Sequence, residues 1–580
     1  MIISKISRRN LFLIGILVAI APSLFLSSTR KAESQNGTLA VMDERQAPNI
    51  LLIVADDLGY SDIGVLGSEI KTPNIDRLAK RGTLFSRFYT APTCSPTRAM
   101  LLTGVDNHLA GLGNMAETLD PQQIGKPGYE GYLNQSVASM AEIFSAANYQ
   151  TYMAGKWHLG TEYDQSPFAR GFQKTFALLG GGASHFADRV GQDLYRTVAY
   201  YRQNGELVDE LPDDFFSSDY FTDTLIRFIK EGDKERPFLG YLSFTAPHWP
   251  LQAPSEDILA QRGNYSAGYD VIRQQRFQAL KEAGLINQDA IQPEGTAPVW
   301  TSLSDEQRVR SERVMEVYAA MVENMDSNIG KLIDELETSG RLKNTIIVFL
   351  SDNGADGLEF EAVASDFAEW TNSFDNSLEN IGHENSFVSY GRGWAHAGEA
   401  PHLGFKGLMT EGGIRSPMIM VAPMLINDQS GGQISRYAHP TAVRDILPTL
   451  LDFANIPNHG EQFGDRKVHP ISGSSLRKAM TRSEFAVHGE RAIGAELWNR
   501  RSVIIGDWKL IKNPTPQGEG KWKLYNLVED SGESNDLSAE YPEIYRLLLE
   551  AYKTYAEENN IIEPTSPFRL VEPENPKPLK

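Results

Sequence analysis

Short apolar runs alternate with longer mixed segments along most of the chain. Runs at residues 50–55, 149–154, 238–244, 345–350 and 418–421 predict strands that are buried on both faces. The apolar spacing at 74–81, 97–102, 313–337 and 442–453 predicts helices between and after them. Strands that alternate with helices are typical of an α/β fold, so we expect a mostly parallel central sheet flanked by helices.

The pattern changes near Arg501. Segments 502–512 and 521–527 predict antiparallel strands around a turn rich in Pro and Gly, and 541–558 predicts a helix. We therefore expect a catalytic domain at 47–480 and a smaller C-terminal α+β subdomain with its tail at 481–580. Two long polar stretches, 255–310 and 355–402, are expected to be loops or inserts of the kind that cover functional sites.

The first 35 residues have a composition of their own. Lys5, Arg8 and Arg9 precede an apolar run at 11–26, and residues 7–13 resemble a twin-arginine export signal. This pattern indicates either an export signal or an N-terminal membrane anchor over 1–35, followed by a linker at 36–46. We expect an exported protein, periplasmic or secreted, that has the export machinery as a partner.

Charge and cysteine content narrow the function classes. The chain has 580 residues, a net charge of −20 and a single cysteine. One cysteine excludes a disulfide within the chain. The negative charge repels polyanions, so nucleic acid is not expected as a partner. A small anion stays compatible with this charge, because a few cations can dominate inside a pocket.

The single cysteine, Cys94, lies in an unusual setting. Ser95 and Pro96 open a predicted helix directly after it, and Arg98 follows one turn later. A helix N-terminus offers free N–H groups and the positive end of a dipole, and a guanidinium suits a tetrahedral oxyanion. The segment therefore predicts an anion site that contains a nucleophile.

Acidic and amide residues follow two of the predicted strands. Asp56 and Asp57 end the first strand, and Asp352 and Asn353 end the fourth. Four oxygen ligands indicate a hard cation, Ca²⁺ or Mg²⁺.

Basic residues and histidines follow other strands. Lys156 and His158 alternate after the second strand, so we expect both to point to one side, and His248 follows the third. Lys406 precedes the stretch 411–415. The remaining histidines near these motifs, His108, His383, His396 and His402, are expected to be structural.

Together these motifs resemble the type I sulfatases of the alkaline phosphatase superfamily, most closely the bacterial arylsulfatases. The resemblance rests on Asp56-Asp57, Cys94–Arg98 (Cys-x-Pro-x-Arg), the stretch Gly155–Gly160 (GKWHLG), Pro247-His248, the stretch Ser351–Gly354 (SDNG), and Lys406 with Glu411–Arg415 (EGGIR). It implies an alkaline phosphatase-like fold. It also implies that a formylglycine-generating enzyme oxidises Cys94 to formylglycine (3-oxoalanine).

The same resemblance implies roles for the other residues. Asp56, Asp57, Asp352, Asn353 and the residue at 94 would hold the cation, with Ca²⁺ favoured over Mg²⁺. Arg98, Lys156, His248 and Lys406 would bind the substrate, the three basic residues through sulfate oxygens, and His158 would contact the hydrated aldehyde. His248 would protonate the leaving oxygen, with Lys406 as the alternative donor.

The expected activity is hydrolysis of sulfate monoesters, with small aryl sulfates first, through a sulfated-enzyme intermediate on formylglycine. The alternatives are a carbohydrate or alkyl sulfatase, or a phosphonate or phosphodiester hydrolase on the same scaffold. A sulfate-binding protein without activity is disfavoured, because every motif position holds its polar residue.

Overall fold

The computed structural model describes residues 47–193, 195–360, 363, 365–425 and 434–565. The predicted export signal or anchor at 1–35 and the linker at 36–46 lie outside the described residues. Within this described part, no helix combines the length and apolarity needed to cross a membrane.

A ten-stranded sheet forms the centre of the fold. Its five middle strands are all parallel, in the spatial order β11 (Thr345–Ser351), β1 (Asn49–Ala55), β10 (Phe238–Ser243), β4 (Gln150–Lys156) and β5 (Lys174–Leu178). Beyond β11 lie β13 (Met418–Val421), β2 (Thr83–Phe85) and β14 (Ser435–Tyr437); beyond β5 lie β8 (Tyr201–Gln203) and β9 (Glu206–Leu207). Antiparallel pairs at β11–β13, β13–β2, β5–β8 and β8–β9 make the sheet mixed.

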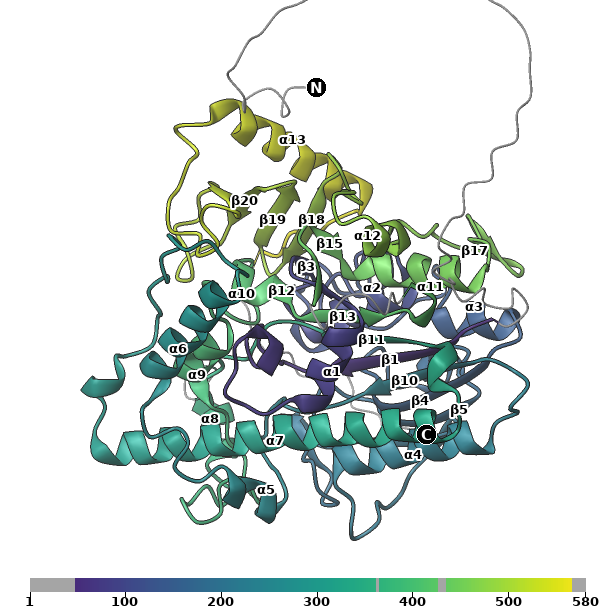
Figure 1. The fold of residues 1–580 in the computed structure, drawn as a ribbon, viewed down its shortest axis with the longest axis horizontal. Coiled ribbons are helices and arrows are strands. Elements are labelled where there is room, and N and C mark those ends of the chain that lie inside the picture. The colour runs from purple at the N-terminus through teal and green to yellow at the C-terminus, as the bar shows by residue number, and fades with distance from the viewer. Residues whose placement is uncertain (1–46, 194, 361–362, 364, 426–433, 566–580) are drawn as a thin grey trace, which may run out of the picture. The chain divides into compact units, whose positions relative to one another are not determined.

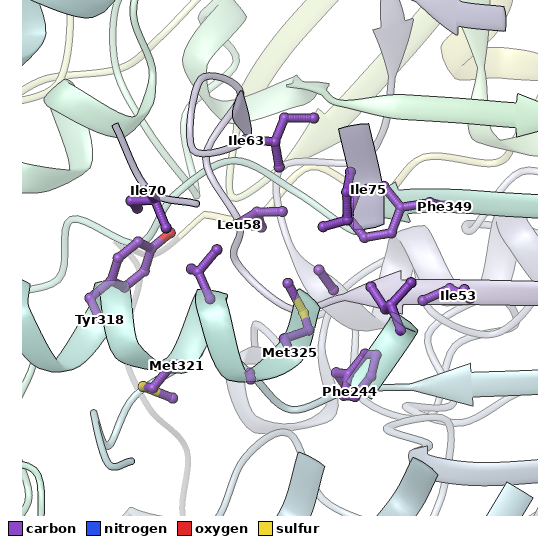
Figure 2. Close-up of a cluster of buried hydrophobic side chains, with 14 of the residues drawn as sticks. Ile53, Leu58, Ile63, Ile70, Ile75, Phe244, Tyr318, Met321, Met325 and Phe349 are labelled. Carbon is purple, nitrogen blue, oxygen red and sulfur yellow. The ribbon is translucent and has the colours of Figure 1, made fainter. Parts of the chain in front are cut away.

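Two apolar cores cover the two faces of this sheet, because successive strand side chains point to opposite faces. In β1, Leu51 and Ile53 belong to one core, and Ile50, Leu52 and Val54 to the other. Apolar side chains of α1 (Pro73–Arg81), α4 (Ser217–Glu231) and α7 (Asp305–Thr338) pack in the first core. Those of α2 (Cys94–Thr103), α3 (Met140–Ala146) and α11 (Ile446–Ala454) pack in the second core. These layers are visible in Figure 1. Figure 2 shows Tyr318, Met321 and Met325 of α7 among the side chains of the first core.

Helix α7 is longer than the predicted 313–337. Its first turns are largely exposed and polar, so they carry no apolar pattern. Ser304 accepts a hydrogen bond from the Gln307 backbone N–H, and the Gln307 side chain accepts one from Ser304, which makes a capping box. The helix start is therefore fixed by capping rather than by hydrophobic periodicity.

The C-terminal subdomain is an antiparallel sheet with one long helix. Strands β18 (Ile493–Leu497), β19 (Arg500–Ile505), β20 (Trp508–Lys512) and β21 (Lys523–Asn526) form the sheet, and α13 (Pro542–Glu558) covers one face. The other face packs on Tyr89, Met409 and Ile414. The expectation of one strand over 502–512 is wrong, because Gly506 and Asp507 turn the chain there and make a hairpin.

The polar stretches hold more helix than expected. Residues 255–310 contain α5 (Ser255–Ala260), α6 (Tyr269–Glu282) and the start of α7, and 355–402 contain α8 (Ser365–Thr371) and α9 (Gly391–Gly398). The predicted helix 442–453 also begins later, since Thr441 and Ala442 form β15 beside β3 (Phe88–Tyr89), whose other neighbour is β12 (Arg415–Ser416). The short elements are β6 (Val190–Asp193), β7 (Arg196–Val198), α10 (Glu411–Ile414), β16 (Gln462–Phe463), β17 (Arg466–Lys467) and α12 (Arg477–Thr481).

Candidate active site

Two neighbouring parallel strands bring the acidic motifs together. Strands β1 and β11 pair in register so that Ala55 lies opposite Ser351, and the residues that follow both strands meet at one sheet edge. The Asp57 backbone N–H donates to Asp352 Oδ1 at 3.3 Å, and Asn353 Nδ2 donates to Asp57 Oδ1 at 2.7 Å. Asp56, Asp57, Asp352 and Asn353 are all buried. The structure thus joins residues that are almost 300 positions apart in sequence.

Cys94 lies directly against these carboxylates. It is buried as the first residue of α2, and its Sγ lies 3.3 Å from Asp56 Oδ1 and 3.7 Å from Asp57 Oδ1. The predicted helix start at Thr97 is therefore three residues late. The first turn of a helix leaves its N–H groups without helical partners, which is why Pro96 fits inside it.

Three basic side chains balance the three carboxylates. Arg98 lies 2.7–2.8 Å from Asp352 Oδ2 through two nitrogens, Lys156 Nζ lies 2.6 Å from Asp56 Oδ2, and Lys406 Nζ lies 2.7 Å from Asp57 Oδ2. Buried charges of this kind persist only when they are paired. Each basic side chain in this cluster therefore lies against a buried carboxyl group.

Burial and these pairs shift the pKa values of the carboxyl groups. Burial raises the pKa of Asp57 to about 8 against the opposing effect of Lys406. Burial would also raise the pKa of Asp56, but Lys156 and Arg98 together hold it well below its usual range. The carboxylates raise the pKa of Lys156 and Lys406 despite burial, so both amines carry a proton.

His248 reaches the same cluster from the loop after β10. Its Nδ1 lies 2.5 Å from the Trp249 carbonyl oxygen, which can only accept, so Nδ1 carries the hydrogen. Its Nε2 faces Asp57 Oδ2 at 3.5 Å. Burial, followed by the charge of Lys406, lowers the pKa of His248 well below 6.5. The neutral ring therefore presents a free Nε2 lone pair to the site.

His158 does not lie on a strand, which corrects the expected alternation with Lys156. Strand β4 ends at Lys156, and His158 has a left-handed backbone with φ 55°. Its Nε2 lies 2.9 Å from Glu117 Oε1, and its Nδ1 is buried without a hydrogen-bond partner among the described residues. Strand geometry therefore does not set the direction of this ring.

The donor set fits a divalent cation. One atom each from Asp56, Asp57, Cys94 and His248 lie within 4.8 Å of one another. Asn353 Oδ1 is buried and has no hydrogen-bond partner among the described residues, as expected for an oxygen kept for a ligand. Carboxylate and amide oxygens are the donors that Ca²⁺ and Mg²⁺ prefer.

Several residues at the site carry no sequence signal. Glu117 pairs with His158, and Asp356 accepts from Trp249 Nε1 at 2.8 Å while it lies 3.4 Å from Lys406 Nζ. Gly181 and Gly182 lie against the two histidines: a Cβ would come within 2.6 Å of His158 Cε1 at 181 and 3.1 Å of His248 Cε1 at 182. Neither glycine belongs to a motif, so only the fold reveals this contact.

Comparisons with known proteins agree with the site. Residues 48–456 match the sulfatase family model. An arylsulfatase of Klebsiella aerogenes is 42% identical over 447 residues, which cover 76% of this chain and 93% of that enzyme. An uncharacterized sulfatase of Schizosaccharomyces pombe is 44% identical over 550 residues, covering 90% and 95% of the two chains.

Solved structures give the same result for the fold. The crystal structure of Ps i-CgsB has a TM-score of 0.64 and 26% identity, and the alignment covers 90% of this chain and 94% of that one. A phosphonate monoester hydrolase of Agrobacterium radiobacter shares the fold with a TM-score of 0.51 and 18% identity, over 88% of this chain and 96% of that one. The chain belongs to the sulfatase family and is a sulfuric ester hydrolase with an alkaline phosphatase-like fold.

Proposed function

We propose that this sulfatase hydrolyses aryl sulfate monoesters through a formylglycine formed from Cys94, with Ca²⁺ as its cation and Mg²⁺ as the alternative. The single observation that carries the proposal is the place of Cys94. The first residue of α2 lies against two carboxylates, and each of these carboxylates is paired with a lysine. A covalent intermediate formed at this position would lie beside the residues that we propose to hold the metal and those that we propose to bind sulfate.

The unmodified thiol suits this position poorly. Burial, followed by the charge of Asp352, raises the pKa of Cys94 well above its ordinary value, so the sulfur stays protonated. A thiol is a weak nucleophile in that state. Oxidation by a maturation enzyme would replace the sulfur with an aldehyde, whose hydrate carries two hydroxyl groups on one carbon.

Both hydroxyls have a task in this reaction. One attacks sulfur, the ester oxygen leaves with its electron pair, and the sulfate is then bonded to the residue at 94. The other hydroxyl next loses its proton, the carbon–oxygen bond to sulfate breaks, and the aldehyde forms again. We assign His158, held by Glu117, to the second step, because its unpartnered Nδ1 can take a proton.

The cation would be held by Asp56, Asp57, Asp352 and Asn353 with the residue at 94, and it would polarise the sulfate. Once the carboxylates are neutralised in this way, Arg98, Lys156 and Lys406 are available to bind the sulfate oxygens. Their paired positions in the structure keep these side chains in place before the substrate binds.

The side of the site near His248 favours an aromatic leaving group. Trp249 contacts Phe360 and Phe387, with ring centroids 5.4 and 5.9 Å apart, and its Nε1 is fixed by Asp356. Phe360 and Phe387 are buried and Trp249 is half-buried, so Trp249 is the ring of this cluster that can pack on an aromatic substrate. The similarity to the Klebsiella arylsulfatase supports the same choice. Carbohydrate sulfates are the second candidate, because one structural neighbour was solved with k-i-k-neocarrahexaose.

We assign the leaving-group proton to His248. A bound sulfate monoester places a negative charge beside Nε2, which opposes the effect of Lys406 and favours the protonated ring. The Trp249 carbonyl keeps its hydrogen bond from Nδ1 in both states, so protonation at Nε2 needs no rotation of the ring.

We also infer that the protein is exported, because residues 1–35 combine basic residues with an apolar run. This segment acts either as a twin-arginine export signal or as an N-terminal membrane anchor. Fractionation of cells that express the full chain tests this inference.

A substrate panel tests the proposed function. The enzyme, co-expressed with a formylglycine-generating enzyme, is given nitrophenyl sulfate, nitrophenyl phosphate, a phosphonate monoester and sulfated sugars. We expect the largest kcat/KM for nitrophenyl sulfate. A larger value for the phosphorus esters would contradict the reaction, and a larger value for sulfated sugars would contradict only the aryl assignment.

A further inference from the structure

The tip of the β18–β19 hairpin has an unusual backbone. Leu497 pairs with Arg500, so only Trp498 and Asn499 form the turn, and both have left-handed backbones with φ 54° and 64°. Such two-residue turns favour Asn and Gly, whereas a bulky side chain with positive φ is rare. Contacts outside the hairpin must therefore hold Trp498, and strained positions of this kind gather at functional sites.

The Trp498 indole contacts the loop that holds His158. Its Nε1 donates to Asn114 Oδ1 at 2.9 Å and to Thr118 Oγ1 at 3.1 Å. Thr118 directly follows Glu117, whose carboxylate lies 2.9 Å from His158 Nε2. The indole thus fixes the short segment that orients this histidine.

Arg500 contacts the segment that holds Lys406. Its Nη1 donates to the carbonyl oxygen of Gly407, and its guanidinium lies 5.2 Å from the centre of the Trp498 ring. Arg500 is only 8% exposed and forms no ion pair with a described acidic residue. A buried guanidinium without a carboxylate is costly, so its place against the main chain at 407 needs a functional reason.

Gly407 lies where three segments of the site meet. Its N–H donates to the Pro92 carbonyl at 2.7 Å, two residues before Cys94, and the preceding Lys406 N–H donates to Ala355 at 2.9 Å. A Cβ at 407 would lie 3.1 Å from Trp498 Cζ3, so the indole packs closely on this glycine.

From these contacts we propose that the tip of the β18–β19 hairpin, Trp498 with Arg500, is a positioning element that the C-terminal subdomain supplies to the active site. Arg500 fixes the main chain beside Lys406, and Trp498 fixes the loop of Glu117 and therefore the His158 ring. This inference rests on the proposed roles of Lys406 and His158. It makes the C-terminal sheet part of the catalytic machinery through position rather than through chemistry.

Four variants of the full-length enzyme test the proposal. Arg500→Gln removes the charge, Arg500→Lys keeps a donor for the Gly407 carbonyl, and Trp498→Phe keeps a ring but removes Nε1. Arg501→Gln is the matched control, because Arg501 lies on the same hairpin but contacts neither the loop of Glu117 nor Gly407: it pairs with Glu563 at 2.6 Å and donates to the Asn499 side chain. Folded fraction and Tm, kcat for nitrophenyl sulfate, and inhibition by inorganic sulfate are measured for each, with activity normalised to folded protein.

We expect Arg500→Gln and Trp498→Phe to lower kcat by on the order of 10-fold to 100-fold, since small displacements of catalytic groups have effects of this size. Arg500→Gln should also raise the sulfate inhibition constant, whereas Arg500→Lys should restore most of both values. A simple packing role would leave the normalised kcat and the sulfate constant unchanged.

Two further variants separate failure of this inference from failure of the proposed function. If Lys406→Ala and His158→Ala are inactive while Arg500→Gln and Trp498→Phe match Arg501→Gln, the positioning inference is wrong and the proposed roles stand. If Lys406→Ala and His158→Ala themselves keep full activity, the proposed roles are wrong.

Discussion

Lys406 Nζ and Asp57 Oδ2 lie 2.7 Å apart. This ion pair joins an ammonium group that is predicted to bind sulfate to a carboxylate that is predicted to bind the metal. The same amine lies 3.4 Å from Asp356, the acceptor of Trp249. One side chain therefore links Asp57, a predicted metal ligand, to Asp356, which holds the Trp249 indole. Removing it should affect chemistry more than folding.

Lys406→Ala and Arg98→Ala should differ in stability although both should lose turnover. Arg98 is completely buried, and its removal leaves Asp352 without its guanidinium, at a cost of about 3–5 kcal/mol. The Lys406 side chain is 12% exposed, so solvent can reach Asp57 after its removal and the cost should be smaller. Thermal unfolding and nitrophenyl sulfate assays check this, and equal losses of stability would contradict the difference in burial.

Chelation should abolish activity, and Ca²⁺ or Mg²⁺ should restore it. Asn353→Ala should lower the amount of bound metal and the activity together. The change removes the side-chain oxygen Oδ1 of Asn353, which has no hydrogen-bond partner among the described residues. Elemental analysis of purified protein measures the metal, with Asn287→Ala at an exposed position as the control. Full metal content in the Asn353 variant would place the cation elsewhere.

The assignment of His248 as the leaving-group acid predicts that the rate of His248→Ala depends more steeply on leaving-group pKa than the wild-type rate does. A poor leaving group needs a proton more than a good phenolate does, so His248→Ala should slow alkyl sulfates far more than nitrophenyl sulfate. The slope is measured over substituted phenyl sulfates. Equal slopes for variant and wild type would move the acid role to Lys406.

The glycine segment after β5 offers a matched test of the same role. Gly182→Ala should steepen the dependence on leaving-group pKa in the same direction as His248→Ala, but less, because the new Cβ would lie 3.1 Å from His248 Cε1. Gly180→Ala is the control, since its Cβ would meet no atom within 4 Å and its backbone is not left-handed. A change of slope at 180 as large as that at 182 would show that the effect does not act through His248.

His108 should make stability depend on pH. Its ring lies 2.8 Å from Asp106 and 3.4 Å from Glu496 of β18, and although burial opposes the charge, these two carboxylates raise its pKa from 6.5 to about 9. Because the pKa of His108 is higher in the folded chain than in the unfolded chain, the charged ring stabilises the fold fully below pH 6.5. This stabilisation is lost as the pH rises to about 9. The loss should be about 3 kcal/mol in urea unfolding. His108→Gln should lack this slope, and an identical slope in the variant would assign it to other groups.

Some of this architecture could be predicted from sequence because local patterns carry it. Apolar runs that end in Asp56 and Ser351 predict buried strands, and parallel strands place their ends at one edge, which brings Asp57 and Asp352 together. The sulfatase family follows from the motifs, and the comparisons confirm it.

Other features could not be predicted because they depend on contacts between distant segments. Trp498 reaches Asn114 across 384 positions, and no local pattern marks either residue. The direction of His158 depends on its left-handed backbone and on Glu117 rather than on strand alternation. The metal, sulfate and acid roles assigned to the individual side chains stay predictions.

Mass spectrometry of the tryptic peptide that contains residue 94, taken from an active preparation, tests the central claim most directly. We predict that most of this peptide carries formylglycine, seen as the mass change from replacing sulfur and two hydrogens with one oxygen, and that turnover rises in proportion to the converted fraction. Full activity in a preparation whose Cys94 is entirely unmodified would contradict the proposed mechanism.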